Sequence, residues 1–311
     1  MNDLELIDEK YYSCFQVAIA TYLKSNNFDD YWYAFPNCWV FDYERNDSVL
    51  LGDKIKSLWM SDIAELKEYT GIVLEIVPSI ENETYLVEID VYDCWWSSVY
   101  KKYHMPHYFL LCKNSQKNMC IIDSFFKKRI ETTTLEINTS DFKKVYKVSI
   151  NNGRKLELTN TICNAMVNMF PKDASITGYE KMRELAIDIL NCDYLSEIKT
   201  QNKDLYMNSL YNSFFRLEAG RYNFFKIIST DLRKKNAELF SDFEQIISSW
   251  EIIRLNISRL LLTDNTSLLK NISKSLYVLS YSEEKALNRL CQLYNINKGE
   301  VYDSNIKIKN T

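Results

Sequence analysis

The hydrophobic pattern changes at Asn151-Asn152-Gly153, and this change most constrains the fold. Before it, short runs of β-branched and aromatic residues follow amphipathic helical stripes, whereas after about residue 158 only helical stripes occur. We therefore predict an α+β domain over residues 1–153 and an all-helical domain over 154–311, with a disordered tail after about residue 300. A chain of 311 residues is long enough for two domains of ordinary size.

Five stretches of the first part have the length and composition of strands. They are 72–77, 85–91, 108–113, 119–124 and 145–150. A polar turn at 114–118 makes the third and fourth a predicted hairpin. Pairing outward from that turn, we expect His107 to lie opposite residue 123 or 124, so that His107 and Asp123 meet across neighbouring strands.

Helical periodicity predicts the remaining elements. One helix is expected over 55–69 in the first part. The second part is expected to hold helices over 159–169, 178–200, 204–229, 232–263, 267–279 and 282–294.

Cys14 is predicted at the first position of a further amphipathic helix. Ser13 and Gln16 have the S-x-x-Q spacing of a capping box, which makes Ser13 the N-cap. The apolar stripe that follows, through Phe15 and Ile19, places Cys14 at the edge of the buried face. The positive end of the helix dipole favours a thiolate at this position.

Only two histidines occur, His104 and His107. An imidazole base acting near neutral pH must therefore be one of them. His107 begins a predicted strand, where Asp123 can hold its ring, whereas His104 lies outside the strand and is expected to be structural or to contact substrate. A cysteine at a helix start, a histidine at a strand start and a carboxylate one strand further on follow the chain order of papain-like Cys-His-Asp enzymes.

Composition excludes several classes of function. The net charge of −4 and pI near 5.5 argue against nucleic acid or an anionic membrane as the main partner. No apolar stretch approaches the roughly 20 residues that span a bilayer, and the acidic start is no signal peptide, so we predict a cytoplasmic protein. The eight cysteines form no C-x-x-C pair, which indicates neither a disulfide framework nor a metal site.

A family resemblance rests on dispersed positions in both parts. They are Leu86 to Tyr92, Tyr100, Tyr103-His104, His107 to Leu111 and Ile121 to Ser124, and in the helical part Leu210 to Phe215, Ala237 to Phe240 and Ser249-Trp250. A strand ending in Asp and Tyr, a Tyr-rich loop, His-x-x-His, a hydrophobic strand and a strand closing with Asp resemble the N-terminal domain of the butirosin-biosynthesis-H type.

The resemblance implies a papain-like fold used for acyl transfer. Members take an acyl group from the phosphopantetheine thioester of a carrier protein onto a cysteine, here Cys14, and deliver it to an amine to form an amide. Similar cysteine-protease homologues form amides in thiotemplated, nonribosomal-peptide-like biosynthesis, including the closthioamide type. No bound cofactor is implied, since the acyl donor carries the phosphopantetheine. Position 8 is Asp8, where papain-like proteases have the Gln of the oxyanion hole.

Two further groups of residues are predicted to bind substrate or partner. The residues expected to contact the substrate or the pantetheine arm are Asp90, Tyr92, Trp95, Trp96, Tyr103 and His104. The basic run expected to dock an acidic carrier protein is Arg221, Lys226, Arg233, Lys234 and Lys235. Asp90 could instead only orient its loop, the aromatic residues could pack on the helical domain, and the basic run could be a solvated helix end.

Two other classes of function are compatible with this sequence. A cysteine peptidase or amide hydrolase would need the same Cys14, His107 and Asp123. A non-catalytic carrier-binding scaffold built on a protease fold would need no reactive thiol.

Overall fold

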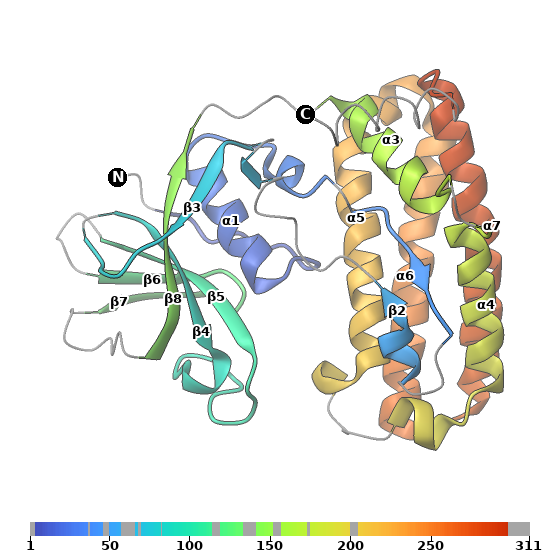
Figure 1. Cartoon of the computed structure of the whole chain (residues 1–311), viewed down its shortest axis with the longest axis horizontal. Helices are drawn as coiled ribbons and strands as arrows, with labels where there is room; N and C mark the ends of the chain where they lie inside the picture. The colour runs from blue at the N-terminus through green and yellow to red at the C-terminus, as the bar shows by residue number, and fades with distance from the viewer. Residues whose placement is uncertain are drawn as a thin grey trace. The chain divides into compact units, whose positions relative to one another are not determined.

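A computed structural model describes residues 4–36, 38–45, 50–56, 66–67, 70–81, 83–113, 119–132, 141–151, 157–172, 175–199 and 205–297. Contacts within the chain divide it into two units, shown in Figure 1. The first unit consists of Met1–Phe35 and Met60–Lys155, and the second of Pro36–Trp59 and Leu156–Thr311. An antiparallel sheet dominates the first unit and helices the second, so the predicted α+β class is confirmed.

A six-stranded antiparallel sheet forms the first unit, with strand order β3-β8-β4-β5-β6-β7. The strands are β3 (Ile72–Ile76), β4 (Tyr85–Asp90), β5 (Pro106–Lys113), β6 (Met119–Asp123), β7 (Lys128–Thr132) and β8 (Phe142–Ile150). The five predicted strands are all present, and β8 begins three residues earlier than expected. The strand β7 was missed because its sequence is mostly polar and it lies at the edge of the sheet.

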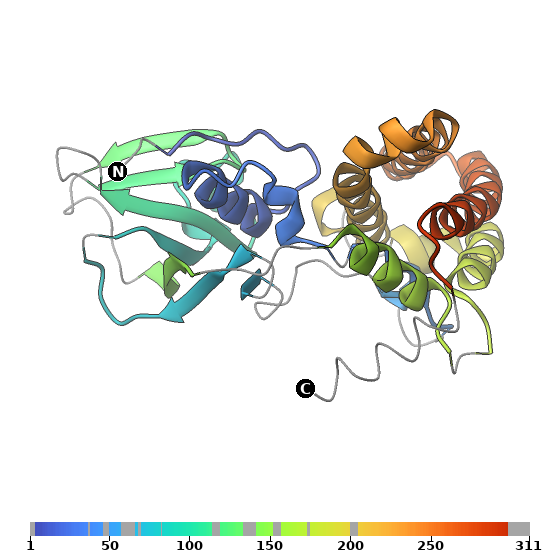
Figure 2. The same cartoon turned by 90° about the horizontal axis from the view of Figure 1, so that it is seen from above.

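The helix α1 (Cys14–Ser25) covers one face of this sheet. Alternate residues of β4, β5 and β6 pack in the cluster that contains α1, among them Leu86, Leu110 and Ile122. The residues between them, such as Phe109 and Ile121, form a second cluster on the opposite face. Strands that are buried on both faces read as continuous apolar runs, which explains why β4 to β6 were the most visible strands in the sequence. Figure 2 shows α1 lying along the sheet.

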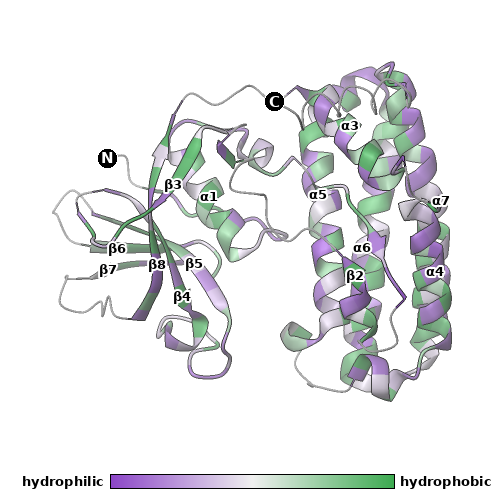
Figure 3. Ribbon diagram, viewed as in Figure 1, coloured by the Kyte–Doolittle hydropathy of each residue, from purple (hydrophilic) through white to green (hydrophobic). Residues whose placement is uncertain are grey.

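Five helices form most of the second unit. They are α3 (Leu158–Met169), α4 (Gly178–Asn191), α5 (Ser209–Lys235), α6 (Ala237–Thr263) and α7 (Ser267–Leu293). The two helices predicted over 267–294 are one continuous helix, and the one predicted over 178–200 ends at Asn191, before a π-helical segment at Tyr194–Lys199. Figure 2 looks along the long helices, and Figure 3 shows hydrophobic and hydrophilic residues alternating along α7.

The segment 36–59 departs from the prediction, because it belongs to the helical unit rather than to a continuous 1–153 domain. It carries the short strands β1 (Asp42–Tyr43) and β2 (Ile55–Lys56), so residues 55 and 56 do not begin a helix; residues 57–65 lie outside the described part of the chain. Trp39 explains the placement, since its fully buried ring packs on Phe224 with ring centroids 4.8 Å apart.

None of the described helices has both the length and the apolar character needed to cross a bilayer.

Candidate active site

Cys14 and His107 come together because α1 begins beside the start of β5. Phe15, the residue after Cys14, packs edge-on against Tyr108, the residue after His107, with ring centroids 5.3 Å apart. The predicted capping box is present: Ser13 Oγ accepts from the Gln16 N–H at 3.2 Å, and Gln16 Oε1 accepts from the Ser13 N–H at 3.0 Å. Cys14 is therefore fixed as the first residue of α1, as predicted.

The β5–β6 register brings Asp123 to His107, although not as expected. Lys113 pairs with Met119 and Leu110 with Ile122. Continuing this register by one residue sets Phe109, and not His107, opposite Asp123 at the end of β6, so the expectation that His107 lies opposite residue 123 or 124 is wrong. His107 lies two residues before Phe109 on the same face of β5, so His107 and Asp123 are diagonal neighbours, within reach of a side-chain contact.

Cys14, His107 and Asp123 form one line of hydrogen bonds. His107 Nε2 lies 2.7 Å from Asp123 Oδ2, which leaves Nδ1 as the ring nitrogen for the hydrogen bond with the Cys14 thiol. His107 is 2% exposed and Asp123 0%, whereas Cys14 is partly exposed. The imidazole and the carboxylate are thus shielded from water, whereas Cys14 is not fully buried.

The surroundings of His107 favour its protonated form. Burial is the largest influence and opposes protonation, but the hydrogen bonds with Asp123 and Cys14, together with the negative charges of both groups, raise the pKa of His107 to about 9. A proton on His107 is therefore retained at neutral pH.

Asp123 is held by donors from two other segments. Trp96 donates its indole N–H to Oδ2 at 2.7 Å, and the Phe126 N–H donates to Oδ1 at 3.1 Å. Both carboxylate oxygens are thus fixed in the direction that His107 needs. Trp96 was expected to line a channel for the pantetheine arm, and its indole N–H is instead committed to Asp123.

Sequence reasoning missed Phe125 and Phe126, which follow β6 after Ser124. Their ring centroids lie 5.9 and 4.9 Å from that of His107. Phe126 packs against the second hydrophobic cluster, whereas Phe125 is 44% exposed. The signal in the sequence was an aromatic pair shortly after the strand that ends in Asp123.

His104 belongs to a separate polar cluster around Asp90. Asp90 accepts hydrogen bonds from His104 and Lys143 and from the N–H groups of Tyr92 and Met105. Burial opposes ionisation of Asp90, but these hydrogen bonds together lower its pKa to about 2. The His104 side chain is 73% exposed and its ring stacks on Tyr92 at 4.2 Å. The two histidines therefore have different surroundings, one inside the line of hydrogen bonds and one on the surface.

The other two residues predicted to contact substrate differ in exposure. Trp95 is 56% exposed, and its ring packs edge-on against Trp96 at 5.6 Å. Tyr103 is half-buried and packs against the second hydrophobic cluster. Trp95 is thus available to a ligand beside the site, whereas Tyr103 contributes mainly to packing.

Arg221 cannot dock a carrier protein, and this prediction is wrong. Its side chain is fully buried in the helical unit, pairs with the buried Glu283 at 2.9 Å and donates to the Val40 carbonyl at 2.8 Å. Trp39 and Trp250 flank its guanidinium. Arg221 was predicted at the surface because it is charged. It lies instead on the apolar face of α5, which is buried in the core of the helical unit.

The rest of the predicted basic run lies nearer the surface. Arg233, Lys234 and Lys235 are exposed in the last turn of α5. Lys226 is half-buried, with its ammonium 5.2 Å from the centre of the Tyr222 ring. Three adjacent cations at a helix C-terminus also interact favourably with the helix dipole, so their position alone does not require a partner.

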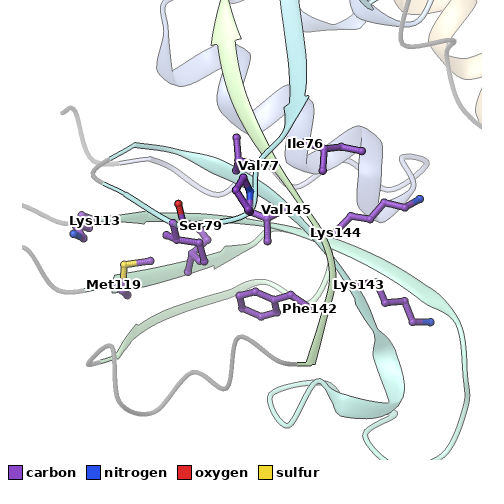
Figure 4. Close-up of a pocket in the computed structure, with 12 residues that line it drawn as sticks. Ile76, Val77, Ser79, Lys113, Met119, Phe142, Lys143, Lys144 and Val145 are labelled. Carbon is purple, nitrogen blue, oxygen red and sulfur yellow. The ribbon is translucent and has the colours of Figure 1, made fainter.

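A cavity of about 570 Å³ opens on the sheet face opposite α1. Figure 4 shows Phe142 and Met119 directed toward it and Lys143 and Lys144 directed away. None of the three residues in the line of hydrogen bonds contributes to its lining.

Within the described ranges, no cluster of His, Cys, Asp and Glu side chains is arranged to hold a metal ion.

No protein-family model matches this sequence, and comparison with curated proteins finds no similar one. The site is therefore interpreted from its own geometry. A thiol at a helix N-terminus, an imidazole and a buried carboxylate joined by hydrogen bonds are the parts of a nucleophilic catalyst.

Proposed function

We propose that this chain is a papain-like cysteine acyltransferase, which moves an acyl group from a carrier-protein thioester onto Cys14 and then to an amine. The observation that carries the proposal is the position of His107 between the Cys14 thiol and the Asp123 carboxylate. The choice of transfer over hydrolysis is supported by the resemblance to the butirosin-biosynthesis-H type.

In the first half-reaction the Cys14 thiolate attacks the thioester carbonyl. The tetrahedral oxyanion forms next to the start of α1, where backbone N–H groups of the first turn have no intrahelical acceptor and can stabilise negative charge. The Cys14 N–H is the nearest of these groups in the chain. Asp8 does not take the place of an oxyanion-hole amide, because its carboxylate is exposed and pairs with Lys127 at 2.7 Å.

The intermediate collapses when the C–S bond to the pantetheine sulfur breaks, which leaves the acyl group on Cys14. The released pantetheine thiolate then takes the proton of His107, so that the imidazole is neutral in the acyl-enzyme. In the second half-reaction an amine attacks this acyl group, and His107 takes the proton from its nitrogen. Asp123 holds the imidazole with Nδ1 toward the sulfur throughout. Exclusion of water at this stage decides whether the product is an amide or a free acid.

The donor is proposed to be an acyl or peptidyl carrier protein, because its phosphopantetheine arm presents a thioester at the end of a flexible chain. Remote contacts with the carrier supply binding energy that orients the thioester at the sulfur. The exposed cations Arg233, Lys234 and Lys235 are candidates for those contacts. No other bound group is required by the chemistry.

Intact-protein mass spectrometry tests this proposal. The protein is mixed with an acyl-loaded carrier protein, and separately with an N-acetylcysteamine thioester, and the mass is followed with time. We expect an acyl adduct that disappears on addition of an amine, with the amide as product, and no adduct on Cys14→Ala.

The alternatives give different results in the same experiment. Rapid release of the free acid, with no amide formed in the presence of amines, would identify a hydrolase. A protein that binds the carrier but never gains the acyl mass would be a scaffold.

A further inference from the structure

The amine acceptor must approach the acyl-enzyme on the His107 side of the sulfur. The amine lone pair attacks the acyl carbon, the C–N bond forms, the C–S bond to Cys14 breaks, and the proton of the amine passes to His107. The departing pantetheine thiol leaves by the same side, because it interacts with the same imidazole. Side chains that flank His107 therefore meet the leaving group and the acceptor, whereas the acyl chain stays on the opposite side of the sulfur.

Phe125 is exposed beside His107 although its backbone is firmly held. Its neighbour Ser124 accepts from the Ile7 N–H at 3.3 Å and is 2.7 Å from Thr21 Oγ1, and on the other side the Phe126 N–H donates to Asp123. The turn is thus fixed by hydrogen bonds on both sides of Phe125. A ring that is 44% exposed in such a turn is not there to fill the core.

Trp95 presents a second exposed ring from a different segment. It packs edge-on against Trp96, whose indole N–H donates to the same Asp123 oxygen that His107 contacts. Of the two exposed aromatic side chains, Phe125 in the turn after β6 packs on His107 itself, and Trp95 in the loop before β5 packs on the indole that bonds Asp123. Large apolar side chains exposed next to reactive groups mark a binding surface.

We propose that Phe125 and Trp95 bind the apolar part of the amine acceptor, so that the site selects amines carrying an aromatic or aliphatic group over hydrophilic amines and water. This inference rests on the proposed acyltransferase function. An apolar group stacked on Phe125 displaces water from the face of His107 and carries the amine nitrogen to the acyl carbon.

The test compares acceptors on a preformed acyl-enzyme. Cys14 is acylated with an N-acetylcysteamine thioester, and 2-phenylethylamine or 2-methoxyethylamine is added at equal concentrations of free base. The rates of amide and free-acid formation are measured. We expect the wild type to use 2-phenylethylamine at least about tenfold faster. In Phe125→Ala and Trp95→Ala, amide formation with 2-phenylethylamine should fall several-fold more than acylation does, and Phe125→Leu should lie between Phe125→Ala and the wild type.

Controls separate this inference from the proposed function. Ile150→Ala removes an exposed apolar side chain, 38% exposed, at the end of β8 and should keep the wild-type preference. Amide formation without a preference, or a preference that survives both alanine variants, would overturn the inference and leave the acyltransferase intact. An equal loss of acylation and amide formation would mean that Phe125 positions the His107 ring and does not bind the acceptor. Failure to acylate Cys14 at all would remove the proposed function and this inference together.

Discussion

At the scale of single residues, the two histidines show how far spacing alone can assign roles. Both lie in His-x-x-His, but only His107 is the second residue of β5, so only His107 is held by a strand against Asp123. His104 precedes the strand and meets Asp90 on the surface. The sequence could distinguish the two histidines because the start of a strand can be predicted from the residues next to it in the chain. The role of Trp96 could not be predicted, because a hydrogen bond across 27 residues depends on the course of a loop.

The two histidines should therefore respond differently to substitution. His107→Ala should lower the acylation rate by about 10²–10⁴-fold, as expected for loss of a general base. His104→Ala should mainly weaken substrate binding or leave activity near normal, and Asp123→Asn should be milder than His107→Ala because an amide still orients the ring. Single-turnover acylation monitored by mass spectrometry, with folding checked by circular dichroism, measures all three. The reverse order for the two histidines would contradict the assignment.

Removing the indole N–H of Trp96 tests its effect on Asp123. Trp96→Phe keeps an aromatic ring but removes one hydrogen bond to a charged group, a contribution of about 1.5–3 kcal/mol. We expect the acylation rate to fall about tenfold or more. Trp95→Phe is the matched control, since the Trp95 ring is 56% exposed and packs edge-on against Trp96, whereas the bond to Asp123 comes from Trp96. Equal effects in both variants would assign Trp96 to packing alone.

The raised pKa of His107 distinguishes transfer from amide hydrolysis by pH. An amine leaving group must be protonated by the imidazolium, so amide cleavage should fall as the pH rises through about 9. A thiol leaves as its thiolate and needs no such proton. Acylation by a thioester should therefore continue above pH 9 in a stopped-flow or quenched-flow series. A steep alkaline loss of thioester acylation would contradict this account.

The same proton also contributes to stability. The pKa of His107 is about 9 in the folded protein and near 6.5 without these contacts, so the protonated ring stabilises the fold fully below pH 6.5. This contribution is lost as the pH rises through about 9. Urea unfolding at a series of pH values should show the loss between these limits, and His107→Gln should flatten that part of the profile.

At the scale of elements, local periodicity predicted which segments form strands but not how they pair at a distance. The runs that became β4, β5 and β6 are buried on both faces and were visible as continuous apolar stretches. The register error at His107 arose because the pairing was projected from an assumed turn, whereas the pairs Lys113 with Met119 and Leu110 with Ile122 fix it. A shift of one or two residues still left Asp123 within diagonal reach.

The segment 36–59 packs on α5 at a point that requires glycine. A Cβ added to Gly220 would lie 2.3 Å from the carbonyl oxygen of Cys38. Alanine normally stabilises a helix interior by about 1 kcal/mol relative to glycine, but here overpacking should reverse the sign and cost about 1–3 kcal/mol. Denaturant unfolding of Gly220→Ala measures this. Lys234→Ala, at an exposed position of α5, should change stability by less than about 0.5 kcal/mol.

At the scale of the whole molecule, hydrophobic periodicity alone could not show to which of the two units each segment belongs. Residues 36–59 precede the sheet but belong to the helical unit, because Trp39 and the buried Arg221 share one aromatic and charged core there. Charge patterning on α5 likewise identified a basic run but could not distinguish a buried arginine from exposed ones. Burial in a bundle depends on the other helices, which a single helical stripe does not specify.

The proposed carrier-docking surface is therefore reduced to the exposed end of α5. A carrier protein with an acidic surface should meet Arg233, Lys234 and Lys235 by long-range attraction, which mainly raises the association rate and weakens with salt. Reversing all three charges to Glu should slow acylation by the carrier-bound thioester about tenfold or more at low ionic strength. Acylation by an N-acetylcysteamine thioester should be unaffected, since that donor carries no acidic surface.

A matched charge reversal on another helix distinguishes an effect of this surface from an effect of the protein's net charge. Lys270, Lys274 and Lys285 are exposed on α7, and changing them to Glu alters the total charge of the protein by the same amount. Measured over a salt series, the α7 variant should acylate from the carrier at nearly the wild-type rate, while the defect of the α5 variant should shrink as salt screens the attraction. Equal losses in both variants would mean that net charge governs the encounter. Equal loss with the carrier and the small thioester would mean that the end of α5 stabilises the fold rather than binding a carrier.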